Sequence, residues 1–172
     1  MRVDLVSQPQ YDSLVELLCE LHSYYNEGSS VPREMVRSHL INNLLAPDSP
    51  LRLVVAYEDV GQVLGFAAIS LTYSLVDPAP EQCRQCQLKE LYVRSAGRSR
   101  GVGKAIMSWV AQYAADNGCH RIDWPVKATN AGGISFYKGL GAQQVVERLS
   151  FRLSEPSLAK LGARSVPANR QR

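Results

Sequence analysis

Residues 98–103, with the sequence RSRGVG, constrain the fold of this chain more than any other segment. They stand between ELYV, a short apolar run typical of a strand, and residues 101–118, whose apolar positions recur with helical spacing. Two glycines close together let the backbone approach a ligand, and the N–H groups at the start of a helix can bind an anion. The sequence therefore predicts a strand, a phosphate-binding loop and a helix in direct succession.

Two well-known kinds of glycine loop fit this segment poorly. A nucleotide-triphosphate loop needs glycine five residues before Gly103, where Arg98 stands, and a hydroxyl residue after Lys104, where Ala105 follows. A dinucleotide fingerprint needs a small residue at the position of Ile106 so that helix and sheet pack closely. The first reading is excluded and the second is disfavoured.

The rest of the chain alternates between strand-type and helix-type patterns. Strands are expected at residues 2–7, 51–58, 62–76, 87–94, 120–127 and 142–153, and helices at residues 11–25, 32–45, 101–118 and 130–141. This order predicts a mixed sheet flanked by helices. Pro125 cannot donate to a sheet ladder, so we expect its strand to separate from a neighbour at that point.

Length and charge favour one domain of an ordinary globular class. The 172 residues can bury a substantial core, and we expect a single domain over residues 1–162 with a mobile basic tail at 163–172. No apolar run approaches the roughly 20 residues that span a bilayer, and the N-terminus lacks the apolar core of a secretion signal. A cytoplasmic protein without membrane partners is predicted, and a net charge of +3 gives weak support to nucleic-acid binding.

The four cysteines do not form a metal-binding pattern. Cys83 and Cys86 make a single CxxC pair, and no second pair of ligands stands at a compatible spacing. We expect free thiols, with this pair exposed at the end of a hairpin, and no bound metal.

Two motifs in order resemble the GCN5-related N-acetyltransferase (GNAT) family. Arg98-x-x-Gly101-x-Gly103 after ELYV is similar to that family's acetyl-coenzyme-A-binding segment, and NAGGISFYKGLGAQ is similar to its Asn…Phe-Tyr-x-x-x-Gly-Ala ending. The resemblance covers essentially residues 2–153 and looks closest to diamine and polyamine acetyltransferases, through ELHSYY and LKELYV. It implies an α/β fold with a mixed, mostly antiparallel sheet, flanked by helices and splayed between its fourth and fifth strands.

The resemblance implies acetyl-CoA as cosubstrate. Backbone N–H groups of the glycine loop would hold the pyrophosphate, and the strand before the loop, interrupted by a bulge, would pair with the pantetheine arm. Asn130 matches a ligand of that arm, although an ordinary helix N-cap would also explain it. The implied cofactor-binding residues are Leu91, Tyr92, Val93, Arg98, Ser99, Arg100, Gly101, Val102, Gly103, Lys104, Asn130 and Gly133.

The resemblance also implies the reacting groups. Tyr137 matches the family's general acid, and its alternative is a helix aromatic that only packs. Glu90, beside the expected bulge, could act as general base or could form a cross-strand ion pair. The amine would attack the thioester directly in a ternary complex, without a covalent enzyme intermediate.

The acceptor is expected to be a primary amine of a small molecule or peptide. Tyr24, Tyr25 and Asn26, at the end of the first helix, are candidates for its pocket. Lys89 stands where the resembled polyamine enzymes carry an acidic residue, and a lysine there would repel a polycation. Polyamine specificity is therefore not expected.

Three alternatives and one assembly state complete the expectations. The chain could be a coenzyme-A-binding regulatory module without turnover, or an acetyltransferase for protein lysines or N-termini. Nucleic-acid binding through the basic tail would instead depend steeply on salt. A homodimer is expected because dimers are common in the resembled family and among soluble enzymes.

Overall fold

The computed structural model describes residues 1–58 and 61–164. Contacts within the chain group it into two compact units, Met1–Asn130 and Ala131–Arg172.

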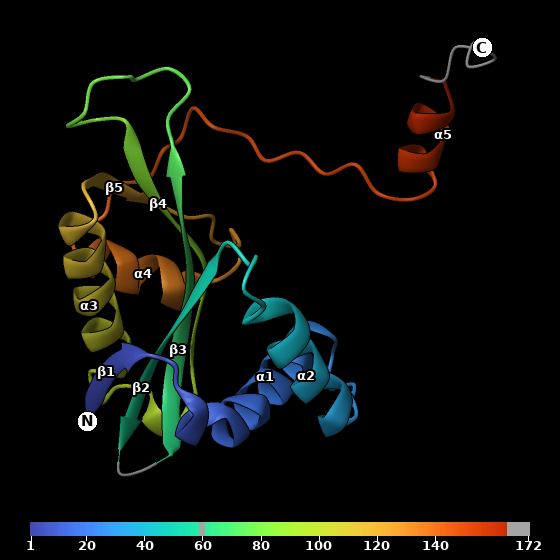
Figure 1. The fold of residues 1–172 in the computed structure, drawn as a ribbon, viewed down its shortest axis with the longest axis vertical. Coiled ribbons are helices and arrows are strands. Elements are labelled where there is room, and N and C mark those ends of the chain that lie inside the picture. The colour runs from blue at the N-terminus through green and yellow to red at the C-terminus, as the bar shows by residue number, and fades with distance from the viewer. Residues whose placement is uncertain (59–60, 165–172) are drawn as a thin grey trace. The chain divides into compact units, whose positions relative to one another are not determined.

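The first unit contains a mixed sheet whose strands follow one another in the order of the sequence, β1-β2-β3-β4-β5 (Figure 1). The first four strands pair antiparallel with their neighbours, whereas β5 joins β4 in parallel. The predicted mixed, mostly antiparallel sheet is therefore confirmed. The strands are β1 Arg2–Leu5, β2 Leu51–Glu58, β3 Gln62–Tyr73, β4 Arg84–Val93 and β5 Cys119–Asp123.

Helices cover both faces of this sheet. Figure 1 shows α1 (Tyr11–Tyr25) and α2 (Arg33–His39) on one side of it and α3 (Val102–Asp116) on the other. Short turns η1 (Gln8–Gln10) and η3 (Ser95–Gly97) precede α1 and α3. The predicted helix at 32–45 forms as α2 followed by a π-helical turn, η2 (Leu40–Leu44).

The core explains why the central strands are apolar on both sides. In β2, Leu53 and Val55 belong to the core cluster under α1 and α2, while Val54 and Ala56, which alternate with them, are equally buried. Because side chains alternate across a strand, this pattern requires cover on both faces. The fully buried residues of α1 and α3 supply that cover: Leu14, Val15, Leu17, Ile106 and Val110.

β4 and β5 pair along only part of their length, as predicted. The ladder joins Arg84 to Cys119, Cys86 to Ile122 and Gln87 to Asp123, and β5 ends there. Pro125 follows two residues later and lacks the N–H that a longer ladder would need. The remainder of β4, residues 88–93, has no partner in β5.

The expectation of two exposed thiols at 83 and 86 is wrong for one of them. β4 begins at Arg84, earlier than predicted, so Cys86 lies within the strand and is fully buried. Burial, with a smaller contribution from Cys119, raises the pKa of the Cys86 thiol to about 11.

The second unit differs from the sequence expectation at its centre. The predicted helix forms as α4 (Ala131–Gly139), and an unpredicted α5 occupies Ser157–Arg164. The predicted strand at 142–153 is wrong, since those residues form no strand and Leu149 and Phe151 are 80% and 90% exposed. A strand needs a neighbouring backbone to complete its ladder, and the described chain supplies none here.

The expectation of one domain over residues 1–162 stays a prediction. The mobile tail expected at 163–172 also stays a prediction, and its residues 165–172 lie outside the described residues. Among the described helices, none has both the length and the apolar character needed to cross a membrane.

Candidate active site

The glycine loop has the backbone conformation of a tight turn into a helix. Ser99 has a φ of 60° and Gly101 a φ of 80°, both in the left-handed region that favours glycine. Gly101 is the N-cap residue of α3. A Cβ at Gly101 would meet no atom within 4 Å, so backbone conformation, not lack of space, favours glycine at this position.

The start of α3 offers backbone donors to an anion. The first hydrogen bond of this helix runs from the Ala105 N–H to the Gly101 carbonyl, at 2.9 Å. The N–H groups of Val102, Gly103 and Lys104 come before it and have no acceptor within the helix. Together with the positive end of the helix dipole, they fit a pyrophosphate group.

Two arginines of the loop are held by neighbouring strands. The Arg98 Nε donates to the Val93 carbonyl at 3.1 Å, and its guanidinium carbon lies 5.8 Å from the centre of the Tyr92 ring. Arg100 makes an exposed ion pair with Glu58 of β2, at 3.3 Å. Arg98 therefore ties the loop to the end of β4, while Arg100 shares its charge with a carboxylate.

A β-bulge interrupts β4 directly before Glu90. Ala68 of β3 pairs with Glu90 and Ile69 pairs with Leu88, so Lys89 has no partner on β3. The bulge expected before the loop is present, and it lies at Lys89. The extra residue bends the strand and changes the direction of the neighbouring side chains.

Among the described residues, the end of β4 pairs with a neighbouring strand on one side only. Leu91, Tyr92 and Val93 pair with β3 on one side. Their other edge faces the side on which β5 has already ended. Backbone donors and acceptors on that edge fit an extended amide-containing chain, which is the chemistry of a pantetheine arm.

Glu90 is oriented by a residue distant in sequence. The Tyr25 hydroxyl, at the last residue of α1, donates to the Glu90 carboxylate, with distances of 3.1 Å to Oε2 and 3.3 Å to Oε1. The Lys127 ammonium lies 4.5 Å from the centre of the Tyr25 ring. Tyr25, Glu90 and Lys127 thus form one contiguous cluster, called the Glu90 cluster below.

Burial and polar contacts shift the pKa of Glu90 in opposite directions. Burial raises the pKa of this carboxyl above its usual value, because a dehydrated carboxylate is disfavoured. The Tyr25 hydroxyl, the Leu91 N–H and the Lys127 charge lower it, with a smaller combined effect. A raised pKa brings a carboxylate closer to the range that suits a general base near neutral pH.

The other predicted acceptor residues lie around this cluster. The Tyr24 ring packs edge-on against Tyr25, with centres 5.2 Å apart, and lies 6.3 Å from Tyr92. Asn26 ends α1, where its side-chain amide donates to the His22 carbonyl at 2.8 Å. Asn26 therefore caps a helix, while Tyr25 is the member that reaches Glu90.

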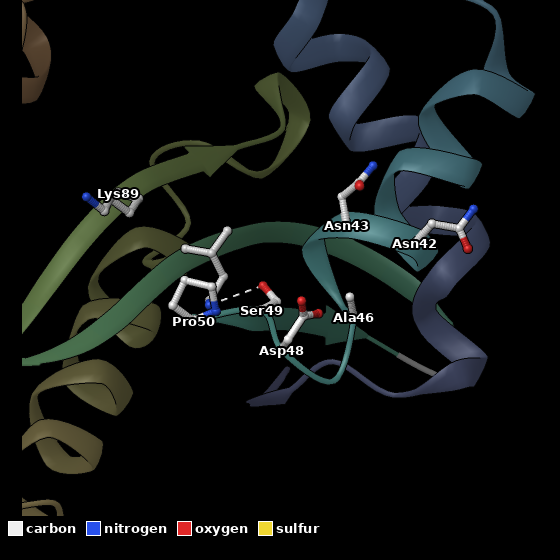
Figure 2. A pocket seen from close by; sticks show the side chains of 8 residues that line it. Asn42, Asn43, Ala46, Asp48, Ser49, Pro50 and Lys89 are labelled. Carbon is white, nitrogen blue, oxygen red and sulfur yellow. Dashed lines mark hydrogen bonds between the residues drawn. The ribbon is translucent and has the colours of Figure 1, made fainter. Parts of the chain in front are cut away.

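Sequence reasoning missed a hollow of about 580 Å³ next to the bulge. Figure 2 shows Lys89 of β4 and, across the hollow, side chains from the segment that joins α2 to β2. That segment contributes two amides, a carboxylate and a hydroxyl. The lining residues are Asn42, Asn43, Ala46, Asp48, Ser49, Pro50, Leu51 and Lys89. The sequence feature that could have indicated this hollow is the pair Asn42 and Asn43, two polar residues in succession within an apolar helical pattern.

Of the predicted site residues, Asn130 is the last residue of the first unit, and Gly133 and Tyr137 lie in the second unit. The N–H of Asn130 donates to the Lys127 carbonyl at 2.8 Å, and Asn130 immediately precedes α4. Gly133 and Tyr137 lie in α4, where the Tyr137 ring packs against Phe136 with centres 5.2 Å apart. Their roles toward acetyl-CoA stay predictions.

A family comparison agrees with this architecture. The model of the Acetyltransferase (GNAT) family matches residues 12–142, from the first turn of α1 to just beyond α4. The chain belongs to this family, which confirms the resemblance that its two motifs indicated.

Three similar proteins have names that describe N-acetyltransferases. A thialysine N-epsilon-acetyltransferase of Mus musculus is 33% identical over 84 residues, which cover 47% of this chain and 49% of that protein. An L-ornithine N5-acetyltransferase of Arabidopsis thaliana is 32% identical over 41% of this chain and 31% of its own length. An aminoglycoside N(6')-acetyltransferase of Klebsiella aerogenes is 24% identical over 81% of this chain and 88% of its own length. The chain thus spans about half the length of the mouse relative.

Solved structures share the fold. An integron cassette protein from the mobile metagenome of V. cholerae superposes with a TM-score of 0.82 at 28% identity, covering 94% of this chain and 96% of that one. An aminoglycoside N-acetyltransferase in complex with CoA superposes with a TM-score of 0.64 at 17% identity, covering 89% and 99%. The second likeness concerns the fold alone.

Proposed function

We propose that the protein transfers an acetyl group from acetyl-CoA to a primary amine of a small molecule or peptide. The observation that carries this proposal is the layout of β4. Glu90 lies at the bulge in the middle of the strand, and the anion-binding loop follows the end of the same strand. A base and a coenzyme-binding backbone are therefore held by one rigid element.

The residues of this chain fit acetyl-CoA, which would supply an activated acyl thioester. The N–H groups of residues 99–104 would bind its pyrophosphate. The open edge of residues 91–93 would bind its pantetheine arm and place a backbone donor near the thioester oxygen, where negative charge develops. Asn130 and Gly133 complete the proposed binding set.

Several proton transfers accompany the acyl transfer. Glu90 accepts a proton from the ammonium form of the acceptor, directly or through water, and so makes the nitrogen nucleophilic. The nitrogen forms a bond to the acyl carbon as the carbon–sulfur bond breaks, and Tyr137 donates a proton to the departing sulfur. The nitrogen then loses its second proton to solvent as the amide forms, and the Tyr137 phenolate takes up a proton from solvent. No step requires a covalent bond to the enzyme.

The proposal excludes a regulatory module that binds coenzyme A without turnover. We would measure acetyl-CoA-dependent thiol release with polyamines, amino acids, aminoglycosides and lysine-bearing peptides as acceptors. Release with one acceptor class, and its loss in Tyr137→Phe with acetyl-CoA binding intact, is the expected result. Binding without release for every acceptor would contradict the proposal and favour the regulatory module.

A small-molecule acceptor is favoured over a protein substrate. The relatives described above are named for acetylation of thialysine, ornithine and aminoglycosides, all of them small amines. A faster reaction with lysine-bearing peptides than with any free amine would contradict this preference.

We also propose a homodimer in the cytoplasm. Several large apolar side chains of residues 145–153 are exposed in the single chain, and a protein surface of this kind is typical of an interface: Val145, Val146, Leu149, Phe151 and Leu153. The four cysteines are free, as in proteins of a reducing compartment. Light scattering should give twice the mass of one chain, and a monomer would contradict the dimer.

A further inference from the structure

Lys127 brings a positive charge next to Glu90 without forming an ion pair. Its ammonium group lies over the Tyr25 ring, 4.5 Å from the ring centre, and the hydroxyl of the same ring donates to the Glu90 carboxylate at 3.1 Å. Among residues 1–58 and 61–164, Lys127 has no ion-pair partner. Its side chain is exposed, so a ligand can reach the ammonium group.

The separation between the two charges is short. Tyr25 contacts both groups, so little more than one tyrosine ring lies between the Lys127 ammonium and the Glu90 carboxylate. The charge of Lys127 acts on Glu90 across this distance and lowers the pKa of that carboxyl. A small ligand that spans the gap would make one charge-assisted hydrogen bond of about 2.8 Å at each end.

A ligand matched to these two groups carries an ammonium and a carboxylate close together. The ammonium donates to Glu90, and the carboxylate accepts from Lys127, so each charge meets its opposite. Lys127 has three N–H donors and can bind a carboxylate while it stays over the aromatic ring. An α-amino acid carries both groups on one carbon and fits this short separation.

We propose that Lys127 binds the α-carboxylate of an amino acid whose α-amine is acetylated at Glu90. This inference rests on the proposed function and names its substrate class. The two relatives described above are named for the ε-nitrogen of thialysine and the N5 nitrogen of ornithine, so a different nitrogen is assigned here.

The short separation also argues against other amines. In a diamino acid that reacts at its distal amine, several methylene groups separate that amine from the carboxylate, and the extended ligand would reach past Lys127. A diamine brings a second cation and no carboxylate, and the charge of Lys127 opposes its binding.

The reaction keeps the balance given for the proposed function. Glu90 takes one proton from the α-ammonium group, and the α-nitrogen forms its bond to the acyl carbon as the carbon–sulfur bond breaks. The sulfur leaves with a proton from Tyr137, and the second proton of the nitrogen passes to solvent. Lys127 holds the carboxylate throughout and exchanges no proton.

The test compares acceptors that differ only at the carboxylate. Glycine, alanine, leucine, methionine and phenylalanine are each paired with their carboxamides, which lack the negative charge. We would measure kcat/KM for thiol release at saturating acetyl-CoA and at a pH above the acid limb of the profile. The ratio of acid to carboxamide is then compared between enzymes, so that differences in amine reactivity and in the pKa of Glu90 cancel.

Variants of Lys127 give the expected changes in this ratio. Lys127→Met should lower it by about fivefold, which corresponds to one exposed charge pair, whereas Lys127→Arg keeps the charge and should stay within about twofold of the unmodified enzyme. Lys160→Met removes an exposed lysine from α5 and is the control that should leave the ratio unchanged.

Ornithine provides a second readout because it carries both kinds of amine. Tandem mass spectrometry of the product locates the acetyl group, and the unmodified enzyme should place it on the α-nitrogen. Acetylation on the side-chain nitrogen would overturn the inference.

The remaining outcomes separate this inference from the proposed function. Turnover of putrescine without turnover of any amino acid, or a ratio that Lys127→Met leaves unchanged, overturns the carboxylate site and leaves the acetyltransferase intact. No turnover with any amine contradicts both. Far-ultraviolet circular dichroism of each variant checks that a loss reflects binding, not unfolding.

Discussion

The two halves of the candidate site are built from different parts of the polypeptide. The proposed coenzyme half, residues 99–104 with the edge of 91–93, presents backbone groups whose geometry is set by a left-handed glycine and a helix start. The proposed acceptor half presents side chains from α1, β4 and the segment after β5. One half is a backbone site and the other is a side-chain site.

This difference suggests how each half responds to mutation. A backbone site tolerates most side-chain changes and fails where a residue cannot adopt the required φ. A side-chain site can be retuned by single substitutions because each charge or hydroxyl acts separately on the ligand. The first half suits a constant cosubstrate, and the second suits an acceptor that differs between relatives.

The largest effect is expected at the base of the side-chain half. Glu90→Gln keeps the shape of the side chain and an acceptor for the Tyr25 hydroxyl but cannot take a proton. We expect kcat/KM for the amine to fall by about 10²- to 10⁴-fold. Acetyl-CoA affinity, measured by calorimetry, should change by less than about twofold. A fall below about tenfold in kcat/KM would remove Glu90 from the catalytic role.

The backbone half is tested at a single glycine. Gly101→Val places a β-branched residue at a φ of 80°, and the left-handed conformation costs about 1–2 kcal/mol for a residue with a Cβ. We expect the loop to relax and acetyl-CoA affinity to fall by about tenfold, while the pH profile of the amine reaction keeps its shape.

The matched control is at the other end of the same helix. Gly118 follows α3 with a φ of 73°, so Gly118→Val carries a similar conformational cost far from the loop. It should lower the free energy of unfolding by about the same amount as Gly101→Val and leave acetyl-CoA affinity unchanged. Equal losses of affinity in both variants would mean that helix stability, not loop geometry, governs binding.

The difference between a backbone site and a side-chain site also explains which features the sequence could predict. The loop was predicted because its glycines and its flanking strand and helix are consecutive residues. The contact between Tyr25 and Glu90 joins residues 65 positions apart, and Lys127 enters from a third segment. Periodicity places such residues on elements but does not bring them together. The wrong strand at 142–153 has a related cause, since an alternating apolar pattern cannot say whether a partner strand is present.

The Glu90 cluster gives a smaller effect with a definite sign. Tyr25→Phe removes a hydroxyl that favours the charged carboxylate, so the pKa of Glu90 should rise further above its ordinary value. The base is then protonated over a wider pH range, and the acid limb of kcat/KM against pH should move to higher pH. Activity well above that limb should be retained.

Two further variants sharpen this prediction. Lys127→Met removes a charge that also lowers the pKa of Glu90, so its acid limb should move in the same direction. Tyr24→Phe removes the neighbouring hydroxyl, which does not bond to Glu90, and should leave the limb in place. A limb that stays fixed or moves to lower pH in Tyr25→Phe would contradict the proposed orientation of the base.

The smallest effect tests whether any side chain matters in the backbone half. Glu58 and Arg100 form an ion pair whose side chains are 38% and 56% exposed, so its net contribution to stability is below about 1 kcal/mol. Glu58→Gln releases Arg100 and removes a negative charge near the loop. Acetyl-CoA affinity should rise about two- to threefold at low ionic strength and not at about 1 M salt, where charges are screened beyond about 3 Å. Glu34→Gln on α2 should have no such effect. A fall in affinity would instead show that Glu58 holds Arg100 in its binding position, so that the position of this side chain, and not only its charge, would matter to the loop.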